Sequence, residues 1–318
     1  MRTITRREFI GGALAVAGSG SVLRVLAAEN KLAFVAAGKE FTFDTSALRG
    51  TLRGGGQSKG LIPMFDCATG TALTKSLGLF SHYRMLDDET RYGKAAWDWA
   101  SEAKLLSDGA VEVRWTADET HPFDMMAVYR WSAPNTLDLT TRLTARKELR
   151  KMEVFIGSYF DGFPDTVVYA GDKPAFIGAP KEAGKWHMFP RDNDAVKLIQ
   201  DGRWKRGSNP VEWAIRPKLA LPVAIRRDAE RKLAAVVLTR PQDCFAMACP
   251  QDEEGHRSIY LSLFGRDLKN GEAVEAKARL IIGRNITNEQ ALKLYERFRS
   301  DQTISTGQRG SDSRKTRP

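Results

Sequence analysis

The residues of this sequence best suited to proton transfer near neutral pH are its four histidines. Each lies among charged or aromatic residues, in the segments SHYR (81–84), THPFD (120–124), WHMFPRD (186–192) and EEGHRS (253–258). A histidine paired with a carboxylate can act as a general acid or base. We take His82 and His187 as the leading pair, with Asp161, Asp192 or Glu254 as the carboxylate partner. The alternative for each histidine is a hydrogen-bonded or surface side chain without a catalytic role.

Groups that can bind a substrate follow His82 in the sequence. Tyr83 and Arg84 come directly after it, and Arg91 and Tyr92 complete a set of acid, base and anion-binding groups within eleven residues. A guanidinium group can hold a carboxylate through two parallel hydrogen bonds. A lyase would use Tyr83 or Tyr92 with a histidine to remove the proton beside a uronate that an arginine neutralises.

Tryptophans in or beside segments without clear periodicity indicate a second kind of binding surface. Sugar rings present apolar C–H faces edged by hydroxyls, so a sugar site combines flat aromatic rings with hydrogen-bonding side chains. Residues 202–217 (GRWKRGSNPVEWAIRP) offer both, with Trp204 and Trp213 as the rings. Asp161 and His256 are further candidates for binding the substrate. Core packing is the alternative role for each tryptophan.

The sequence carries no signature of a bound cofactor or metal ion. No glycine-rich phosphate loop follows a predicted strand, and no HxH, HExxH or CxxC spacing occurs. The cysteines at positions 67, 244 and 249 are odd in number, which indicates free thiols rather than a disulfide framework. We therefore expect neither a cofactor nor a metal ion.

Short strands are the elements expected to position these residues. They are rich in β-branched and aromatic residues and lie at 111–115, 125–131, 136–145, 152–160, 233–239, 258–265 and 273–283. In the segment 136–145, leucines alternate with polar residues, the period of a strand with one wet face. The stretches 46–76, 161–195 and 200–217 lack such periodicity and are expected to be irregular.

A helix is predicted at 288–300. Thr287 and Gln290 form a capping box at its start, in which each side chain satisfies a backbone N–H of the other residue. Apolar residues at 291, 294, 295 and 298 then line one face, which is expected to pack on a sheet. Residues 301–318 are polar without apolar periodicity and are predicted to be a disordered tail.

The first 28 residues have the parts of an export signal: a cationic start, an uncharged run and a stretch of small residues. The segment TRREFI (5–10) matches the twin-arginine signal family at every position. This resemblance implies recognition of Arg6 and Arg7 by the twin-arginine translocation machinery, cleavage after Ala27 or Ala28, and a bacterial protein that is periplasmic or secreted. An uncleaved anchor or an ordinary N-terminal helix is the alternative.

The charge of the rest of the chain bears on its partners. Residues 1–28 contain four arginines and one glutamate, which leaves +7 of the formal +10. This surplus is spread along the chain, and no nucleic-acid-binding module with stacking aromatics is present, so no nucleic-acid partner is expected. A uronate polysaccharide or a membrane surface would suit the charge, and solvated surface charge is the alternative.

The organisation of the chain resembles the galactose mutarotase-like superfold, a large antiparallel β-sandwich found in sugar epimerases, polysaccharide lyases and hydrolase accessory domains. The strands from 111 to 160, the preceding HYR (82–84) and RYG (91–93) segments and the strands from 233 to 283 carry the resemblance. It implies a mainly β fold in which residues 29–300 form one supersandwich domain with a C-terminal helix. The Asn-His pair of the epimerases is not found, so none of their catalytic residues is transferred.

The function expected from these features is that of an exported protein that binds or acts on carbohydrate through histidine and carboxylate chemistry. Three alternatives are a lyase acting on a uronate polymer, a non-catalytic carbohydrate-binding protein, and a structural envelope protein without a sugar site.

Overall fold

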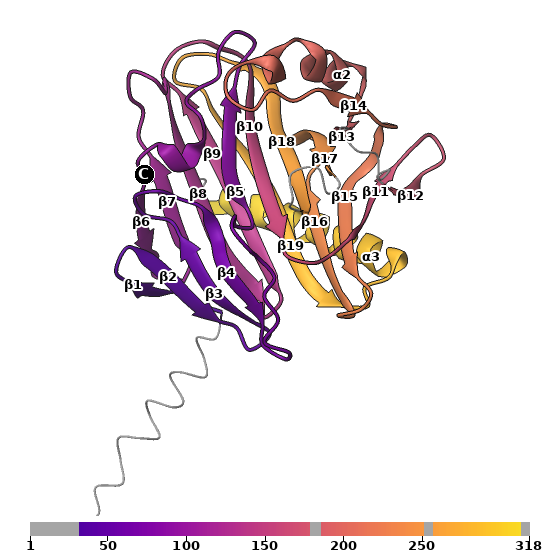
Figure 1. Ribbon diagram of the computed structural model, residues 1–318. Coiled ribbons are helices and arrows are strands. Elements are labelled where there is room, and N and C mark those ends of the chain that lie inside the picture. Colours follow the sequence, from indigo (N-terminus) through magenta and orange to yellow (C-terminus); the bar gives the residue numbers. More distant parts are fainter. Residues whose placement is uncertain (1–31, 179–185, 251–256, 313–318) are drawn as a thin grey trace, which may run out of the picture.

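Two large β-sheets pack face to face, and a smaller sheet lies beside them (Figure 1). The computed structural model describes residues 32–178, 186–250 and 257–312. The nine-stranded sheet has the order β12 (Ala175–Gly178), β11 (Asp165–Ala170), β15 (Leu219–Asp228), β16 (Leu233–Thr239), β19 (Ala273–Arg284), β9 (Thr136–Ala145), β8 (Phe123–Ala133), β7 (Val111–Trp115) and β6 (Glu102–Leu105). The six-stranded sheet has the order β14 (Trp213–Ile215), β13 (Trp186–Pro190), β17 (Cys244–Ala248), β18 (Arg257–Leu268), β10 (Leu149–Phe160) and β5 (Ser81–Leu86). The four-stranded sheet comprises β1 (Val35–Ala37), β2 (Glu40–Asp44), β3 (Leu48–Arg53) and β4 (Gly60–Asp66).

Side-chain alternation places the main core between the two large sheets. On β9, Leu137 and Leu139 are buried in this core, and Asp138 between them points to the opposite face. On β10, Val154 faces the core, whereas Phe155 belongs to a second cluster on the outer face of the six-stranded sheet. Every strand segment predicted from the sequence is present, and the predicted mainly β sandwich is confirmed.

Helix α3 (Asn288–Asp312) packs on the outer face of the nine-stranded sheet, behind it in Figure 1. The predicted capping box is present, with the Thr287 N–H donating to Gln290 Oε1 at 2.8 Å and the Gln290 N–H donating to Thr287 Oγ1 at 3.2 Å. The helix continues past its expected end at Ser300. The backbone remains helical to Asp312 where a disordered tail was expected, because the sequence contains no proline there to interrupt the backbone hydrogen bonds. Among the described residues, no helix combines the length and apolar character required to cross a membrane.

Segments expected to be irregular contain regular structure. Strands β3 and β4 lie within 46–76, and β11, β12 and β13 lie within 161–195. Helix α2 (Asn193–Gln200) begins at Asp192, whose carboxylate accepts a hydrogen bond from the Ala195 N–H at 2.8 Å. Ala195, Leu198 and Ile199 pack on the outer face of the six-stranded sheet. Two short 3-10 helices complete the fold, η1 (Ala96–Asp98) and η2 (Arg203–Lys205).

A buried ion pair fastens η2 to this outer face. Arg203 Nη1 lies 3.2 Å from Glu153 Oε2 of β10, and neither side chain is exposed to solvent. Arg203 also donates to the carboxylate of Asp201 at 2.8 Å and to the carbonyl of Lys151 at 2.9 Å. Its neighbour Trp204 lies edge-on against Phe155. Charge pairing and aromatic packing therefore hold the segment after α2 against the sheet.

Replacing Arg203 with methionine is predicted to lower the free energy of unfolding by about 3–5 kcal/mol, because it leaves the Glu153 carboxylate buried without its cation. Urea denaturation at neutral pH measures the change. Arg266→Met is the matched control, since Arg266 is 56% exposed and pairs with Glu272 on the surface. The control should change stability by less than about 1 kcal/mol. Equal effects of the two substitutions would contradict the role given to Arg203.

Candidate functional site

A β-bulge on β5 determines which side chains face outward. Phe155 of β10 pairs with Arg84 and Ile156 pairs with His82, so Tyr83 is an extra residue in β5. A bulge of this kind changes the alternation of side chains, and bulges are common beside functional sites. His82 consequently points into the core, whereas both Tyr83 and Arg84 lie on the outer face.

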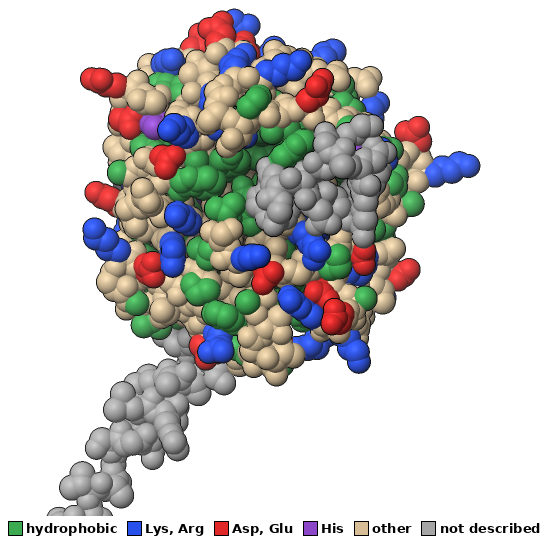
Figure 2. Space-filling view, in the orientation of Figure 1, with side chains coloured by type: hydrophobic (Ala, Val, Ile, Leu, Met, Phe, Trp, Pro, Cys, Tyr) green, Lys and Arg blue, Asp and Glu red, His purple; other side chains and the backbone are tan. Residues whose placement is uncertain are grey.

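Tyr83 and Trp97 of η1 form a parallel aromatic stack on this face. Their ring centroids are 4.7 Å apart with an interplanar angle of 7°, and both side chains are half-buried. Figure 2 shows hydrophobic side chains gathered over the region of β5 and β10. The stack therefore combines flat apolar surface with the Tyr83 hydroxyl. We define the outer-face site as Tyr83, Arg84, Arg91, Trp97 and Trp204.

Arg84 lies between two aromatic rings of this site. Its guanidinium carbon is 4.8 Å from the Tyr83 ring centroid and 5.0 Å from that of Trp204. Its Nη2 donates to the carbonyl of Asn209 at 2.8 Å and to the Tyr83 hydroxyl at 3.3 Å. Arg84 is only 3% exposed, and its Nε and Nη1 have no hydrogen-bond partner within the described part of the chain.

Arg91 connects the two loops that border the site. Its Nη2 donates to the carbonyl of Lys94 at 2.6 Å, and its Nη1 donates to the carbonyls of Arg206 and Ser208. Burial, followed by the positive charge of Arg84, lowers the pKa of Arg91. The two guanidinium groups are thus close enough to repel each other. Hydrogen bonds from Arg84 and Arg91 therefore hold the segment after η2, in addition to the ion pair of Arg203.

The predicted pair of His82 and His187 is not brought together. The strand order places β5 and β13 four spacings apart, ~19 Å at the usual distance between neighbouring strands. Each histidine is 1% exposed. His82 Nε2 lies 3.0 Å from Thr141 Oγ1 of the opposite sheet, and its ring packs near Trp115. Burial lowers the pKa of His82 to about 3, so at neutral pH this side chain is a neutral core residue.

The predicted carboxylate partners are also outside the site. Asp192 caps α2 and pairs with Arg191. Asp161 follows the end of β10, where its backbone pairs with Leu73. Glu254 and His256 lie outside the described residues.

The remaining predicted residues divide between the site and the core. Tyr83, Arg84, Arg91 and Trp204 lie together as described. Tyr92 points inward, where its hydroxyl donates to Asp87 and its ring lies edge-on to Phe123. Trp213 packs edge-on against Trp204, with ring centroids 5.1 Å apart, and so contacts the site through Trp204. The sequence contains no signal that pairs Tyr83 with Trp97, because the stack depends on the bulge.

His121 has a carboxylate neighbour but lies outside the outer-face site. His121 Nδ1 is 2.9 Å from Asp118 Oδ1, and the imidazole stacks on Trp99 at a centroid distance of 4.1 Å. Both rings line a pocket, but His121 is 6% exposed and Trp99 is 5% exposed, so neither offers a broad surface to a sugar. Across the described ranges, no group of three or more His, Cys, Asp or Glu side chains is arranged to hold a metal ion.

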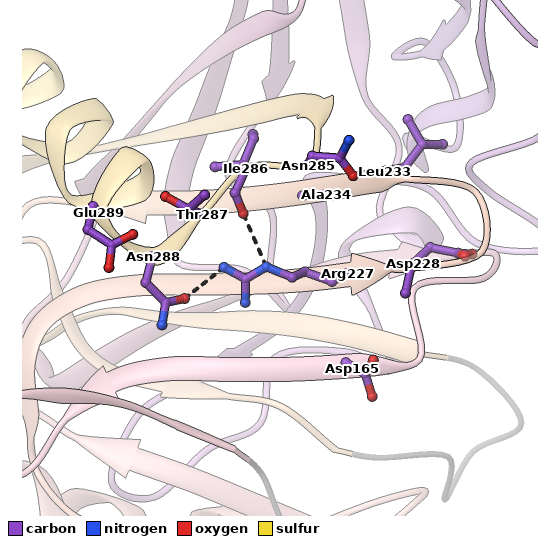
Figure 3. Close-up of a pocket in the computed structure, with 11 residues that line it drawn as sticks. Asp165, Arg227, Asp228, Leu233, Ala234, Asn285, Ile286, Thr287, Asn288 and Glu289 are labelled. Carbon is purple, nitrogen blue, oxygen red and sulfur yellow. Dashed lines mark hydrogen bonds between the residues drawn. The ribbon is translucent and has the colours of Figure 1, made fainter.

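A pocket lies at the start of α3, away from the outer-face site (Figure 3). Arg227 crosses it and donates to the side chain of Asn288 at 2.7 Å and to the carbonyl of Ile286 at 3.2 Å. Its lining includes the carboxylates of Asp165, Asp228 and Glu289 but no aromatic ring. This pocket lacks the flat surface that a sugar ring requires, and we do not place the site there.

The buried position of His82 predicts a specific acid sensitivity. The unfolded chain binds a proton at His82 near pH 6.5 and the folded protein only near pH 3, so its contribution to stability is lost as the pH falls below 6.5. Between pH 7 and pH 5 this loss amounts to about 2 kcal/mol. His82→Gln should therefore lose about 2 kcal/mol less than the unmodified protein over this interval, as measured by urea denaturation at both pH values. Equal losses would show that His82 is accessible to protons in the folded state.

Comparisons with known proteins give likeness in structure alone. No protein-family model matches the sequence, and no curated protein matches it significantly. Similar solved structures include a putative aldose 1-epimerase from Escherichia coli K12, with 11% identity, a TM-score of 0.45 and coverage of 80% of this chain and 99% of that chain. A galactose mutarotase-like protein from Lactobacillus casei has 10% identity, a TM-score of 0.48 and coverage of 77% and 100%. A heparan sulfate lyase mutant from Pedobacter heparinus has 8% identity, a TM-score of 0.46 and coverage of 84% and 40%. At such low similarity, none of them assigns a substrate or a catalytic residue to this chain.

Proposed function

We propose that this protein binds carbohydrate at the outer-face site. The observation that carries the proposal is the half-buried parallel stack of Tyr83 and Trp97 beside the guanidinium of Arg84. The C–H face of a pyranose packs well on flat aromatic surface, and the ring hydroxyls require hydrogen-bonding groups at its edge. The Tyr83 hydroxyl and the Arg91 guanidinium supply such groups.

Binding fits the geometry better than histidine and carboxylate catalysis does. The described histidines lie in the core or are covered by an aromatic ring, and Glu153, the nearby acid on β10, is paired with Arg203. Tyr83 is the titratable hydroxyl that the site offers for proton transfer. A lyase reaction, if the protein catalyses one, would therefore use Tyr83 rather than His82.

Replacing Trp97 with alanine is predicted to weaken saccharide binding about tenfold, because the substitution removes one ring of the stack, worth about 1.4 kcal/mol. Calorimetric titration with neutral and uronic oligosaccharides measures the affinity. The matched control is Tyr169→Ala, which opens the Tyr169–Phe176 ring pair of β11 and β12 on the other sheet.

The control variant should bind as the unmodified protein does. If Trp97→Ala binds saccharide as tightly as the unmodified protein does, the outer-face site is not the binding site. If the unmodified protein binds no saccharide, the proposal that it binds carbohydrate is overturned. The same mixtures are assayed for unsaturated products, whose formation would assign a lyase reaction.

We further propose export across the inner membrane by the twin-arginine route. The support is the TRREFI segment (5–10), which lies outside the described residues. The route carries folded proteins, and a carbohydrate-binding protein with three free cysteines needs no oxidising compartment to fold.

Replacing both Arg6 and Arg7 with lysine is predicted to retain the full-length precursor in the cytosol, because the translocation machinery recognises the arginine pair. Cell fractionation followed by immunoblotting measures the distribution. Arg2→Lys is the matched control and should leave export unchanged. Continued export of the double variant would contradict the assignment.

A further inference from the structure

Two other buried arginines of the described chain, Arg203 and Arg279, are neutralised by carboxylates. Arg203 pairs with Glu153 and Asp201, and Arg279 pairs with Asp138 at 2.6 Å and with Asp301 at 2.8 Å. Arg84 and Arg91 differ from this pattern. Within the described ranges, no carboxylate lies within 4.0 Å of either guanidinium, and their hydrogen bonds go to backbone carbonyls and to Tyr83.

The acidic groups near the outer-face site already have partners. The Asp87 carboxylate accepts hydrogen bonds from the Tyr92 hydroxyl and from the N–H groups of Glu89 and Thr90. Asp88 pairs with Arg150 at 3.0 Å. Neither carboxylate forms an ion pair with Arg84 or Arg91, and within the described ranges the two guanidinium groups have no carboxylate partner.

A third guanidinium adds to this surplus. Arg206 donates to the carbonyls of Asp87 and Asp88 and has no ion-pair partner among the residues that the structure describes. Repulsion between neighbouring cations in a partly desolvated site raises the free energy of the empty protein. An anion placed there would relieve this repulsion.

We infer that the sugar recognised at the outer-face site carries a negative charge, and that Arg91 with Arg84 binds its anionic group while Tyr83 and Trp97 support its ring. This inference rests on the proposed function. Guanidinium groups bind planar carboxylates through paired donors, and Nε of Arg84 and Nε of Arg91 have no partner in the described chain. A uronate is the sugar class that fits both parts of the site.

The test compares oligogalacturonate with its methyl ester, which keeps the same rings but lacks the charge. The unmodified protein should bind the free acid at least tenfold more tightly than the ester. The binding of the acid should weaken as ionic strength rises, whereas the binding of the ester should not. A sulfated dextran oligosaccharide forms a third arm, and preference for it over the uronate would identify a sulfate ester as the source of the charge.

Arg91→Gln should abolish the preference for the acid, because it weakens binding of the acid, which loses a charge pair, more than binding of the ester, which loses only a hydrogen bond. Arg91→Lys should retain part of the preference because it keeps the charge. Arg49→Gln is the matched control, since Arg49 stacks on Phe65 of the smaller sheet and its loss removes the same charge elsewhere.

Because Arg91 also joins two loops, Arg91→Gln is first checked for native stability, and the salt dependence of the unmodified protein serves as the readout if this variant unfolds. Equal affinity for acid and ester, without salt dependence, would overturn the inference and leave carbohydrate binding in place. Failure to bind all three sugars would overturn both.

Discussion

The outer-face site depends on one buried ion pair, that of Arg203 with Glu153. Both side chains are completely buried, and the pair anchors the segment after α2 on strand β10. Trp204 and Asn209, which contact Arg84, belong to this anchored segment. Without the pair, neither the second ring against Arg84 nor the carbonyls that bind Arg91 would have a fixed position. A fully buried charge pair therefore supports the proposed binding surface.

Buried arginines on the outer face of the six-stranded sheet lie in two different environments. Arg203 pairs with carboxylates and is neutralised, whereas Arg84 lies between Tyr83 and Trp204 and has two donor atoms without a partner in the part of the chain that the structure describes. Aromatic faces attract a cation but do not cancel its charge. A site built in this way holds its rings and its positive charge ready before a ligand arrives, which reduces the ordering cost of binding. The positive charge of the site is the basis for our proposal that it prefers an acidic sugar to a neutral one.

Much of the fold could be predicted from the sequence, because alternation and capping are local signals. The leucines of β9 and the capping box of α3 are examples. Helix α2 was not predicted, although the sequence holds a cap at Asp192 and the spacing of Ala195, Leu198 and Ile199, because it is short and lies in a segment rich in charge. The site could be predicted only in part. Tyr83, Arg84 and Arg91 were candidates, yet the direction in which Tyr83 and His82 point depends on a bulge against β10, and the separation of His82 from His187 depends on strand order.

A crystal structure of the protein with bound oligogalacturonate is the most direct test of the proposed site. We predict a sugar ring packed against the exposed side of the Tyr83–Trp97 stack, with its carboxylate about 3 Å from a guanidinium nitrogen of Arg91. A sugar bound instead in the pocket at the start of α3, or on a surface remote from β5, would contradict it.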